Sequence, residues 1–236
     1  MDWFDSDYYH ILYKHRDYNE ARNFIDNIIE YLDLKKGSKI LDLACGIGRH
    51  SIYLDKIGFK VVGTDKSPNN IKKAKASQNQ SLNFLQMEMI DNTNHKYDGI
   101  FNLFTSFGYV NHDYNLKTVK NIERQLKDNG TVVVDFMNTL FVKNNLVIEE
   151  TKVINDLSFK IKRRSDGKFI YKEIKFNDKK DYFFHEKVMD LSLNDFESYL
   201  KRYNLRIIKT FGDYNLNDFD IKNSERLIMV IKKSQP

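Results

Sequence analysis

The sequence predicts an α/β fold, in which a parallel sheet carries helices on both faces. The apolar run at 39–43 is followed by a loop that contains Gly46 and Gly48, and helix-like sequence comes next. A second apolar run, over 60–64, ends directly before Asp65. A strand, a glycine loop, a helix and a strand ending in an acid make half of a nucleotide-binding sheet. Strands and helices alternate further along the chain, which predicts a parallel arrangement.

Seven strands are expected in this sheet, because seven short apolar runs are separated by helical sequence or by turn signals. The fifth run contains three consecutive valines, and the helix before it is expected to end at Asn129-Gly130. The expected strands cover residues 39–43, 60–64, 83–87, 99–104, 131–136, 206–211 and 226–232.

Helices are expected where apolar residues recur at helical spacing or where a capping signal begins a segment. Over 18–34 the apolar residues share one face. Ser67-Pro68 caps another helix, with proline in its first turn, and Ser192 with Asp195 resembles a capping box. The expected helices cover 18–34, run through 52–57, begin at 68, cover 116–128 and run through 196–200.

The pattern changes after residue 147, where period-2 alternation replaces the strand-helix order. Short strands are expected over 158–164, 169–176 and 182–189, with turns at Asp166-Gly167 and Asn177-Asp178. We expect a single domain over 1–236, in which 148–190 is an inserted antiparallel β lid. The insertion follows the fifth strand, at the carboxyl edge where such sheets bind ligands, so we expect the lid to roof the ligand pocket.

Composition argues against several classes of protein. The chain has 236 residues, a formal charge of +5 and one cysteine, Cys45. A single cysteine rules out an internal disulfide framework and fits the reducing cytoplasm. No run approaches the roughly 20 apolar residues of a membrane span, so we expect no membrane partner. Lysines are scattered over apparent helix faces, which favours a solvated surface over a nucleic-acid groove.

The glycine loop at first suggests a dinucleotide site. Such a loop normally has a third glycine, and here Ser51 takes its place. Asp42, four residues before Gly46, would repel a pyrophosphate and would favour an ammonium or sulfonium ion. A sheet that needs glycine only for a tight strand-to-helix turn is the simpler alternative.

The run from Asp42 to His50, with Asp65 at this distance, resembles motif I of the class I S-adenosylmethionine (SAM) methyltransferases. The resemblance covers nearly the whole chain and points to a bacterial small-molecule methyltransferase-like family of unassigned substrate. It implies a Rossmann-like seven-stranded sheet of order 3-2-1-4-5-7-6, with strand 7 antiparallel, and SAM as cofactor. The opening also resembles that of glycine- and sugar-N-methyltransferases. Further matching segments are Trp3-Phe4, Tyr8-Tyr9, Leu12-Tyr13, Arg16-Asp17, Glu20-Ala21, 102–109, 211–214 and 224–227.

Matching positions imply roles for single residues. Asp42 would orient the methionine amino group, and Asp65 would accept both ribose hydroxyls. Tyr13 and Arg16 would reach the methyl group and the SAM carboxylate, although helix packing and a surface ion pair stay open as alternatives. Glu88 stands where the family usually has Asp. The implied cofactor-binding set is Tyr13, Arg16, Asp42, Ala44, Cys45, Gly46, Gly48, Asp65, Lys66, Ser67, Glu88, Met89, Asn102, Leu103 and Phe104.

Methyl transfer is an in-line displacement, so the protein must align the acceptor and exclude water. A base is needed only if the acceptor arrives protonated. Tyr13 and His185 are the candidate catalytic residues, and His10 is a further candidate base. His185 and Glu186 are neighbours on one strand, so at most one of them faces the pocket. We expect no metal, because no Cys/His spacing is typical of zinc and the fourth strand offers no acid for magnesium.

The leading hypothesis is methyl transfer to N or O of a small-molecule acceptor, by a cytoplasmic monomer or homodimer. Enzymes that methylate planar amides and base amines carry a Pro-Pro loop after the fourth strand, where this chain reads Asn102-Leu103-Phe104-Thr105. An RNA or protein methyltransferase and a non-catalytic SAM-binding regulator remain alternatives. An NAD-dependent oxidoreductase is a more distant one.

Overall fold

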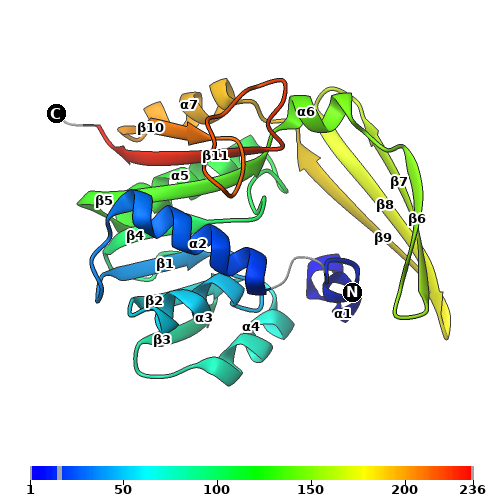
Figure 1. Ribbon diagram of the computed structural model, residues 1–236, viewed down its shortest axis with the longest axis horizontal. Coiled ribbons are helices and arrows are strands. Elements are labelled where there is room, and N and C mark those ends of the chain that lie inside the picture. The colour runs from blue at the N-terminus through cyan, green and yellow to red at the C-terminus, as the bar shows by residue number, and fades with distance from the viewer. Residues whose placement is uncertain (1, 15–17, 235–236) are drawn as a thin grey trace.

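The main sheet of the computed structural model has the expected topology. The structure describes residues 2–14 and 18–234. Its strands are Lys39–Leu43 (β1), Lys60–Asp65 (β2), Leu82–Gln86 (β3), Tyr97–Asn102 (β4), Leu126–Met137 (β5), Leu205–Phe211 (β10) and Arg226–Lys233 (β11). Within the described residues they pair in the order β3-β2-β1-β4-β5-β11-β10, and β11 is antiparallel to both neighbours (Figure 1). The predicted order 3-2-1-4-5-7-6 with an antiparallel seventh strand is therefore confirmed.

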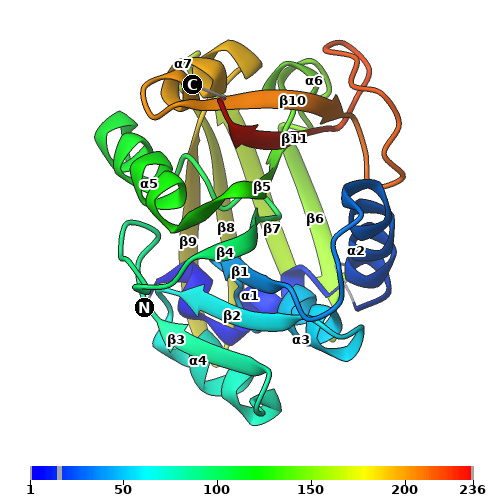
Figure 2. The same cartoon turned by 90° about the vertical axis from the view of Figure 1, so that its left-hand side faces the viewer.

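Helices cover both faces of this sheet, as the turned view in Figure 2 shows. On one face Tyr18–Leu32 (α2), Arg49–Lys56 (α3) and Pro68–Ala74 (α4) share a buried apolar cluster with β1 and β2. On the other face His112–Gln125 (α5) and Leu193–Lys201 (α7) pack against β4 and β5. Shorter helices cover Lys75–Ser77 (η2) and Thr139–Asn144 (α6). Ser192 and Asp195 form the expected capping box of α7.

One boundary, between α5 and β5, differs from the expected one. The sequence predicts a helix that ends at Asn129-Gly130, whereas α5 ends at Gln125 and β5 begins at Leu126. Leu126 is fully buried and pairs with Tyr97 of β4. Its burial extends the strand through exposed polar residues that resemble a turn, so tertiary packing outweighs the local signal.

A second, antiparallel sheet is inserted between α6 and α7, and we call it the lid. Its strands, in order, are Glu149–Ile154 (β6), Leu157–Ser165 (β7), Phe169–Asp178 (β8) and Lys180–Met189 (β9). The expected turn at Asp166-Gly167 forms, with Gly167 at φ 81°. β6 is an additional strand that its charged sequence did not reveal. Asn155 and Asp156, both at positive φ, make the tight turn that joins β6 to β7.

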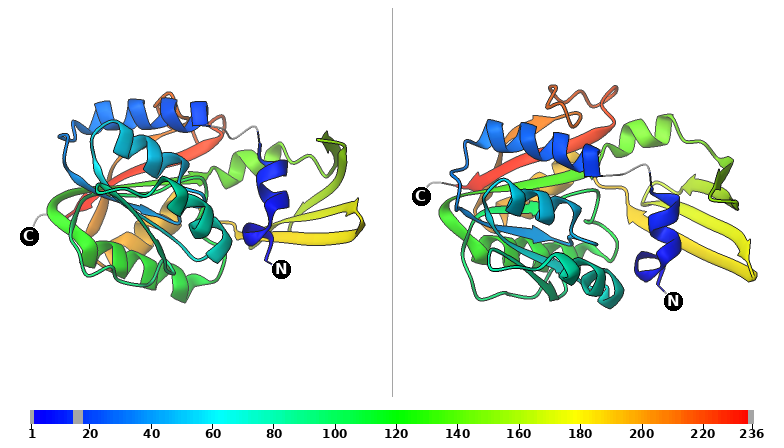
Figure 3. Two further views of the ribbon diagram at one scale, coloured as in Figure 1. Left: turned by 90° about the horizontal axis from the view of Figure 1, so that it is seen from below. Right: turned by 60° about the horizontal axis from the view of Figure 1, so that its bottom comes forward.

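The beginning of the chain packs against one face of the lid. Trp3–Asp5 (η1) and Asp7–Leu12 (α1) belong to a segment, residues 2–14, that we call the N-terminal cap. Trp3 and Leu12 share a buried cluster with Phe159 and Ile174 of the lid. Figures 1 and 3 show α1 between the main sheet and the lid. An antiparallel sheet commonly buries only one face, and here the cap covers that face.

Candidate active site

A cavity of about 570 Å³ lies at the carboxyl ends of β1 to β4. This is the edge at which parallel α/β sheets bind their ligands. The loops that follow these strands form one side of the wall. The N-terminal cap forms the other side with Phe4, Tyr9, His10, Tyr13 and Lys14.

The loop after β1 turns sharply, and its two glycines serve different purposes. Gly46 and Gly48 have φ values of 57° and 84°, which suit glycine. A Cβ built on Gly46 meets no atom within 4 Å, and this residue lines the cavity. A Cβ on Gly48 would lie 2.7 Å from the ring of Phe84 on β3. Gly46 therefore leaves room for a ligand, whereas Gly48 allows the start of α3 to pack against β3.

Asp42 lines the cavity from β1 and is almost fully buried, with 1% of its surface exposed. It accepts a hydrogen bond from Ser51 Oγ at 2.5 Å. Ser51 is the residue that replaces the third glycine of a dinucleotide loop, so the replacement supplies a partner for the acid. Burial raises the pKa of Asp42 to about 6. A buried carboxylate at this place favours a cation such as an ammonium group.

Asp65 ends β2, and two backbone amides fix its orientation. The Gly46 N–H donates to Oδ2 at 2.9 Å, and the Ser67 N–H donates to Oδ1 at 2.8 Å. Burial raises the pKa of Asp65 as well. Each carboxylate oxygen has further acceptor capacity, so Asp65 can accept the two neighbouring hydroxyls of a ribose.

The loops after β2 and β3 form a side of the cavity that suits a flat heterocycle. Met89 lines this side, where its polarizable thioether can contact a ring. The Tyr114 hydroxyl donates to Glu88 Oε2 at 2.7 Å. Lys66 Nζ lies 5.8 Å from the centre of the Phe4 ring. This is the place at which the resemblance puts adenine.

The loop after β4 is held in an unusual backbone conformation. Phe104 and Thr105 have φ values of 59° and 54°, a region that costs roughly 1–2 kcal/mol for a residue with a Cβ. Buried Asp135 of β5 accepts a hydrogen bond from the Phe104 N–H at 2.8 Å and one from the Tyr214 hydroxyl at 3.1 Å. Arg226 donates from Nε to Asp135 at 2.8 Å and from Nη2 to Thr105 Oγ1 at 2.9 Å. A buried ion pair thus holds this loop against the cavity.

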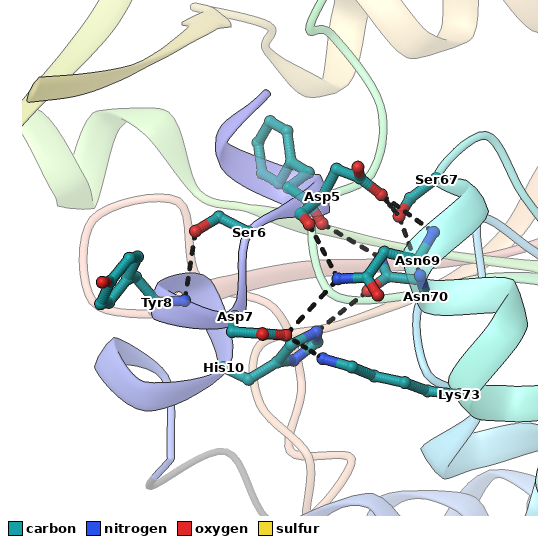
Figure 4. Close-up of polar contacts among 10 residues, drawn as sticks. Asp5, Ser6, Asp7, Tyr8, His10, Ser67, Asn69, Asn70 and Lys73 are labelled. Carbon is teal, nitrogen blue, oxygen red and sulfur yellow. Dashed lines mark hydrogen bonds and ion pairs between the residues drawn. The ribbon is translucent and has the colours of Figure 1, made fainter. Parts of the chain in front are cut away.

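The cap is fastened to the segment that follows β2, as Figure 4 shows. Asp5 accepts hydrogen bonds from the Ser67 hydroxyl and from the Asn69 N–H, the latter at 3.0 Å. Asp7 forms an ion pair with Lys73 of α4. The cap therefore borders the cavity from a position set by its own polar contacts with α4.

His10 of the cap lines the cavity, and its ring contacts Asn70 of α4, as Figure 4 shows. The Asn70 amide nitrogen donates to the Phe4 carbonyl at 3.1 Å, so Asn70 Oδ1 faces His10 Nε2 at 2.9 Å. Nε2 therefore carries the ring proton, and Nδ1 carries the lone pair. Burial lowers the pKa of His10, which keeps the ring neutral near pH 7.

Tyr13, the C-cap residue of α1, connects the cavity with the lid. Its ring lines the cavity and lies edge-on to Phe104, with 6.0 Å between the ring centres. Its hydroxyl donates to Glu186 Oε1 of β9 at 2.9 Å. Burial and, after it, the charge of Glu186 raise the pKa of Tyr13 well above its usual value, so the phenol stays protonated.

His185 does not reach the cavity, which corrects its expected role as a catalytic residue. It is exposed on the outer face of β9, beside Phe183, because the inward position belongs to Glu186. Among the described residues that line the cavity, none comes from 148–190. The cap forms the wall that the lid was expected to form, and the lid covers the cap.

Three further expected residues lie next to the cavity wall and not in it. Gly48 faces Phe84, and Ser67 caps α4 by accepting a hydrogen bond from the Asn70 N–H. Asn102 is fully buried, and its amide nitrogen donates to the Leu43 carbonyl at 2.8 Å. Arg16 lies outside the described residues.

The other expected residues do line the cavity: Tyr13, Asp42, Ala44, Cys45, Gly46, Asp65, Lys66, Glu88, Met89, Leu103 and Phe104. The expected set omits further lining residues, namely Phe4, Tyr9, Lys14, Ile47, Arg49, His50, Asn70, Met87, Thr105, Ser106, Tyr109, Val110 and Tyr114. Several of these lie in the matched segments near the start of the chain and at 102–109, which was the available signal. Asn70 and Tyr114 carry no such signal, because only the packing of α4 and α5 brings them to the cavity.

Comparisons with known proteins agree with this geometry. The profile of a family described as a methyltransferase domain matches residues 34–187. The chain is 32% identical over 132 residues to YqeM of Bacillus subtilis (strain 168). The name of that relative describes it as a methyltransferase by inference. That match covers 54% of this chain and 51% of YqeM, so the chain spans about half the length of this curated relative.

Solved structures share the fold along nearly the whole chain. A SAM-dependent methyltransferase from Clostridium acetobutylicum ATCC 824 has a TM-score of 0.82 at 21% identity, over 97% of this chain and 96% of that one. SAM-bound CalS10, an amino pentose methyltransferase from Micromonospora echinaspora, has a TM-score of 0.74 at 14% identity, over 97% and 98%.

The solved structures that share this fold include SAM-dependent methyltransferases. The chain belongs to the methyltransferase domain family, whose profile covers more than half of it. The residues fit SAM: Gly46 leaves open space, Asp42 offers a buried charge, and Asp65 offers a paired acceptor. Within residues 2–14 and 18–234, no helix is long and apolar enough to cross a membrane, and no group of His, Cys, Asp and Glu could hold a metal ion.

Proposed function

We propose that the protein transfers the methyl group of SAM to a nitrogen or oxygen atom of a small-molecule acceptor. We further propose that it does so as one cytoplasmic domain, a monomer or a homodimer. The position of the N-terminal cap carries the proposal. Five cap residues border the same cavity as the cofactor loops, so an acceptor beside the methyl group has to fit beneath the cap. That space suits a small molecule better than an RNA or protein segment.

The residues divide into a cofactor side and an acceptor side. When bound, SAM supplies an activated methyl group. On the cofactor side, Asp42 attracts the ammonium group and Asp65 binds the ribose. On the acceptor side, the rings of Tyr13 and Phe104 exclude water and orient the acceptor. His10, neutral and with its lone pair on Nδ1, takes the proton of an acceptor that arrives protonated.

The test is turnover of SAM with fractions of one cell extract. We expect S-adenosylhomocysteine to form with the small-molecule fraction, and mass spectrometry of that fraction identifies the methylated product. Asp65→Ala serves as the control with a damaged cofactor site. Turnover only with the RNA or protein fraction would replace this proposal with the macromolecular alternative. SAM binding by calorimetry without turnover in any fraction would favour a regulator.

A further inference from the structure

We propose that the lid controls methyl transfer through Tyr13, with Lys172 and Glu186 as the positioning residues for that side chain. The inference rests on the proposed function, because it concerns the acceptor side of the same cavity. It gives the lid a role although no described lid residue lines the cavity.

Lys172 and Glu186 form a cross-strand pair on the inner face of the lid. They are direct register partners on β8 and β9, and their side chains are only 14% and 10% exposed. Lys172 Nζ lies 3.8 Å from Glu186 Oε1. Other inward positions of these strands are apolar: Ile170, Ile174, Phe176, Phe184 and Val188. Two buried charges in such a surface carry a desolvation penalty, which only close polar partners offset.

Those partners come from the N-terminal cap. Trp3 Nε1 donates to Glu186 Oε1 at 2.6 Å. The Tyr13 hydroxyl donates to the same carboxylate, at 2.9 Å and 3.2 Å from its two oxygens. Lys172 Nζ donates to Tyr13 Oη at 2.6 Å. The Tyr13 hydroxyl is thus held by an anion that accepts a hydrogen bond from it and by a cation that donates a hydrogen bond to its oxygen.

The ring of Tyr13 passes this positioning on to the cavity. It contacts Phe104 edge-on at 6.0 Å and Tyr9 at 4.8 Å between ring centres, and all three rings line the cavity. On the cofactor side, Asp42 accepts its hydrogen bond from Ser51, and Asp65 accepts hydrogen bonds from Gly46 and Ser67, which lie outside this cluster. Loss of the pair should therefore affect acceptor turnover and leave SAM affinity close to normal.

Trp3 offers a direct readout of this junction. It is the only tryptophan of the chain, so a ¹H–¹⁵N correlation spectrum contains a single indole signal. Glu186→Gln removes the charge that this indole contacts, and the signal should shift. His185→Gln, on the neighbouring outward position, is the matched control and should leave the signal in place. An indole signal that does not shift in Glu186→Gln would refute the contact between Trp3 and Glu186.

The kinetic test compares SAM affinity with turnover. In Glu186→Gln and Lys172→Met, calorimetry should show a SAM dissociation constant near that of the unaltered protein. Formation of S-adenosylhomocysteine with the small-molecule fraction should fall by about 10- to 100-fold, as expected for a misplaced positioning group. Lys172→Arg, which keeps the donor, should recover much of the rate, and His185→Gln should keep all of it.

The outcomes separate this inference from the proposed function. If the unaltered protein fails to turn over SAM with every small-molecule fraction, the proposed function is refuted, and this inference falls with it. An active unaltered protein with fully active Glu186→Gln and Lys172→Met refutes the inference alone. A parallel loss of SAM affinity and turnover would also overturn it, because the pair would then support the structure as a whole.

Discussion

Asp65 provides the most direct test of the cofactor site at the scale of single residues. Asp65→Ala is expected to weaken SAM binding by roughly 1–3 kcal/mol, because two ribose hydroxyls lose a charged acceptor. Asp65→Asn should weaken it less, since one acceptor oxygen remains. Calorimetry with SAM measures both effects, and thermal unfolding checks that each variant is folded. Unchanged affinity in the alanine variant would reject the ribose assignment.

Asp42 should make stability and SAM affinity depend on pH in opposite directions. Burial raises the pKa of Asp42 in the folded chain to about 6 from the usual 3.8. The contribution of the protonated Asp42 to stability is therefore fully present below pH 3.8. As the pH rises through about 6, up to about 3 kcal/mol of that stability is lost, because the folded chain must bury a charge. SAM affinity should rise over the same range, since only the ionised carboxylate attracts the ammonium group.

Asp42→Asn tests both halves of this prediction, because it keeps the shape and removes the titration. Urea unfolding below and above pH 6 should show a smaller pH dependence in this variant than in the unaltered protein. Its SAM affinity should be lower and should depend less on pH than that of the unaltered protein. An equal pH dependence of unfolding in both proteins would contradict the prediction.

Local spacing predicted Asp42, Gly46 and Asp65, because each sits at a fixed distance from a strand end. The same reasoning could not place His185. Alternation along a strand says only that His185 and Glu186 face opposite sides. Which side is buried depends on what packs against the strand, and the packing partner is the N-terminal cap, more than 170 residues away in sequence.

At the scale of elements, the two glycines of the loop after β1 give opposite predictions. Gly46→Val should abolish SAM binding and leave the sheet folded, because the side chain occupies open space in the cavity and strains a φ of 57°. Gly48→Ala should lower stability, because its Cβ would lie 2.7 Å from the Phe84 ring. Calorimetry and urea unfolding of both variants test the division, and normal SAM affinity in Gly46→Val would make the loop a structural turn only.

The ion pair between Asp135 and Arg226 should be the main support of the loop after β4. Arg226→Met is expected to lower the free energy of unfolding by about 3–5 kcal/mol, because it leaves a buried carboxylate without its cation. Tyr214→Phe, which removes one hydrogen bond to the same carboxylate, is the matched control and should cost about 1 kcal/mol. Urea unfolding compares them, and equal costs would show that the ion pair has no special role.

Sequence patterns predicted elements well where burial and local signals agree, as in β1 and in the capping box of α7. They failed where the two conflict. The burial of Leu126 extends β5 through a turn-like segment, and β6 pairs with β7 although half of its residues are charged. Both errors have one physical cause, since a strand's partner supplies hydrogen bonds and burial that a single segment does not reveal.

At the scale of the whole molecule, the cap and the lid depend on each other. The lid buries its inner face against Trp3 and Leu12, and the cap is fastened to α4 through Asp5 and Asp7. The sequence placed the insertion at the ligand edge of the sheet. It could not show that a segment from the beginning of the chain lies between the insertion and the cavity, because that arrangement has no local pattern.

Replacing residues 149–187 with a short linker is the test of this arrangement. Val188 and Met189 stay, because they belong to the core of the main sheet. SAM binding should survive, since no described lid residue lines the cavity and α4 still holds the cap. Methyl transfer should be lost, because Tyr13 loses the partners that hold its hydroxyl.

Calorimetry with SAM and formation of S-adenosylhomocysteine with the small-molecule fraction measure the two effects of the shortened lid. Val153→Ser, on a lid position that is 71% exposed, is the control that should change neither. Loss of SAM binding would show that the lid maintains the cofactor side through the cap. A shortened protein that keeps its methyl transfer but changes from dimer to monomer would instead make the lid an oligomerisation element, because its outer face would then be the surface that a second copy covers.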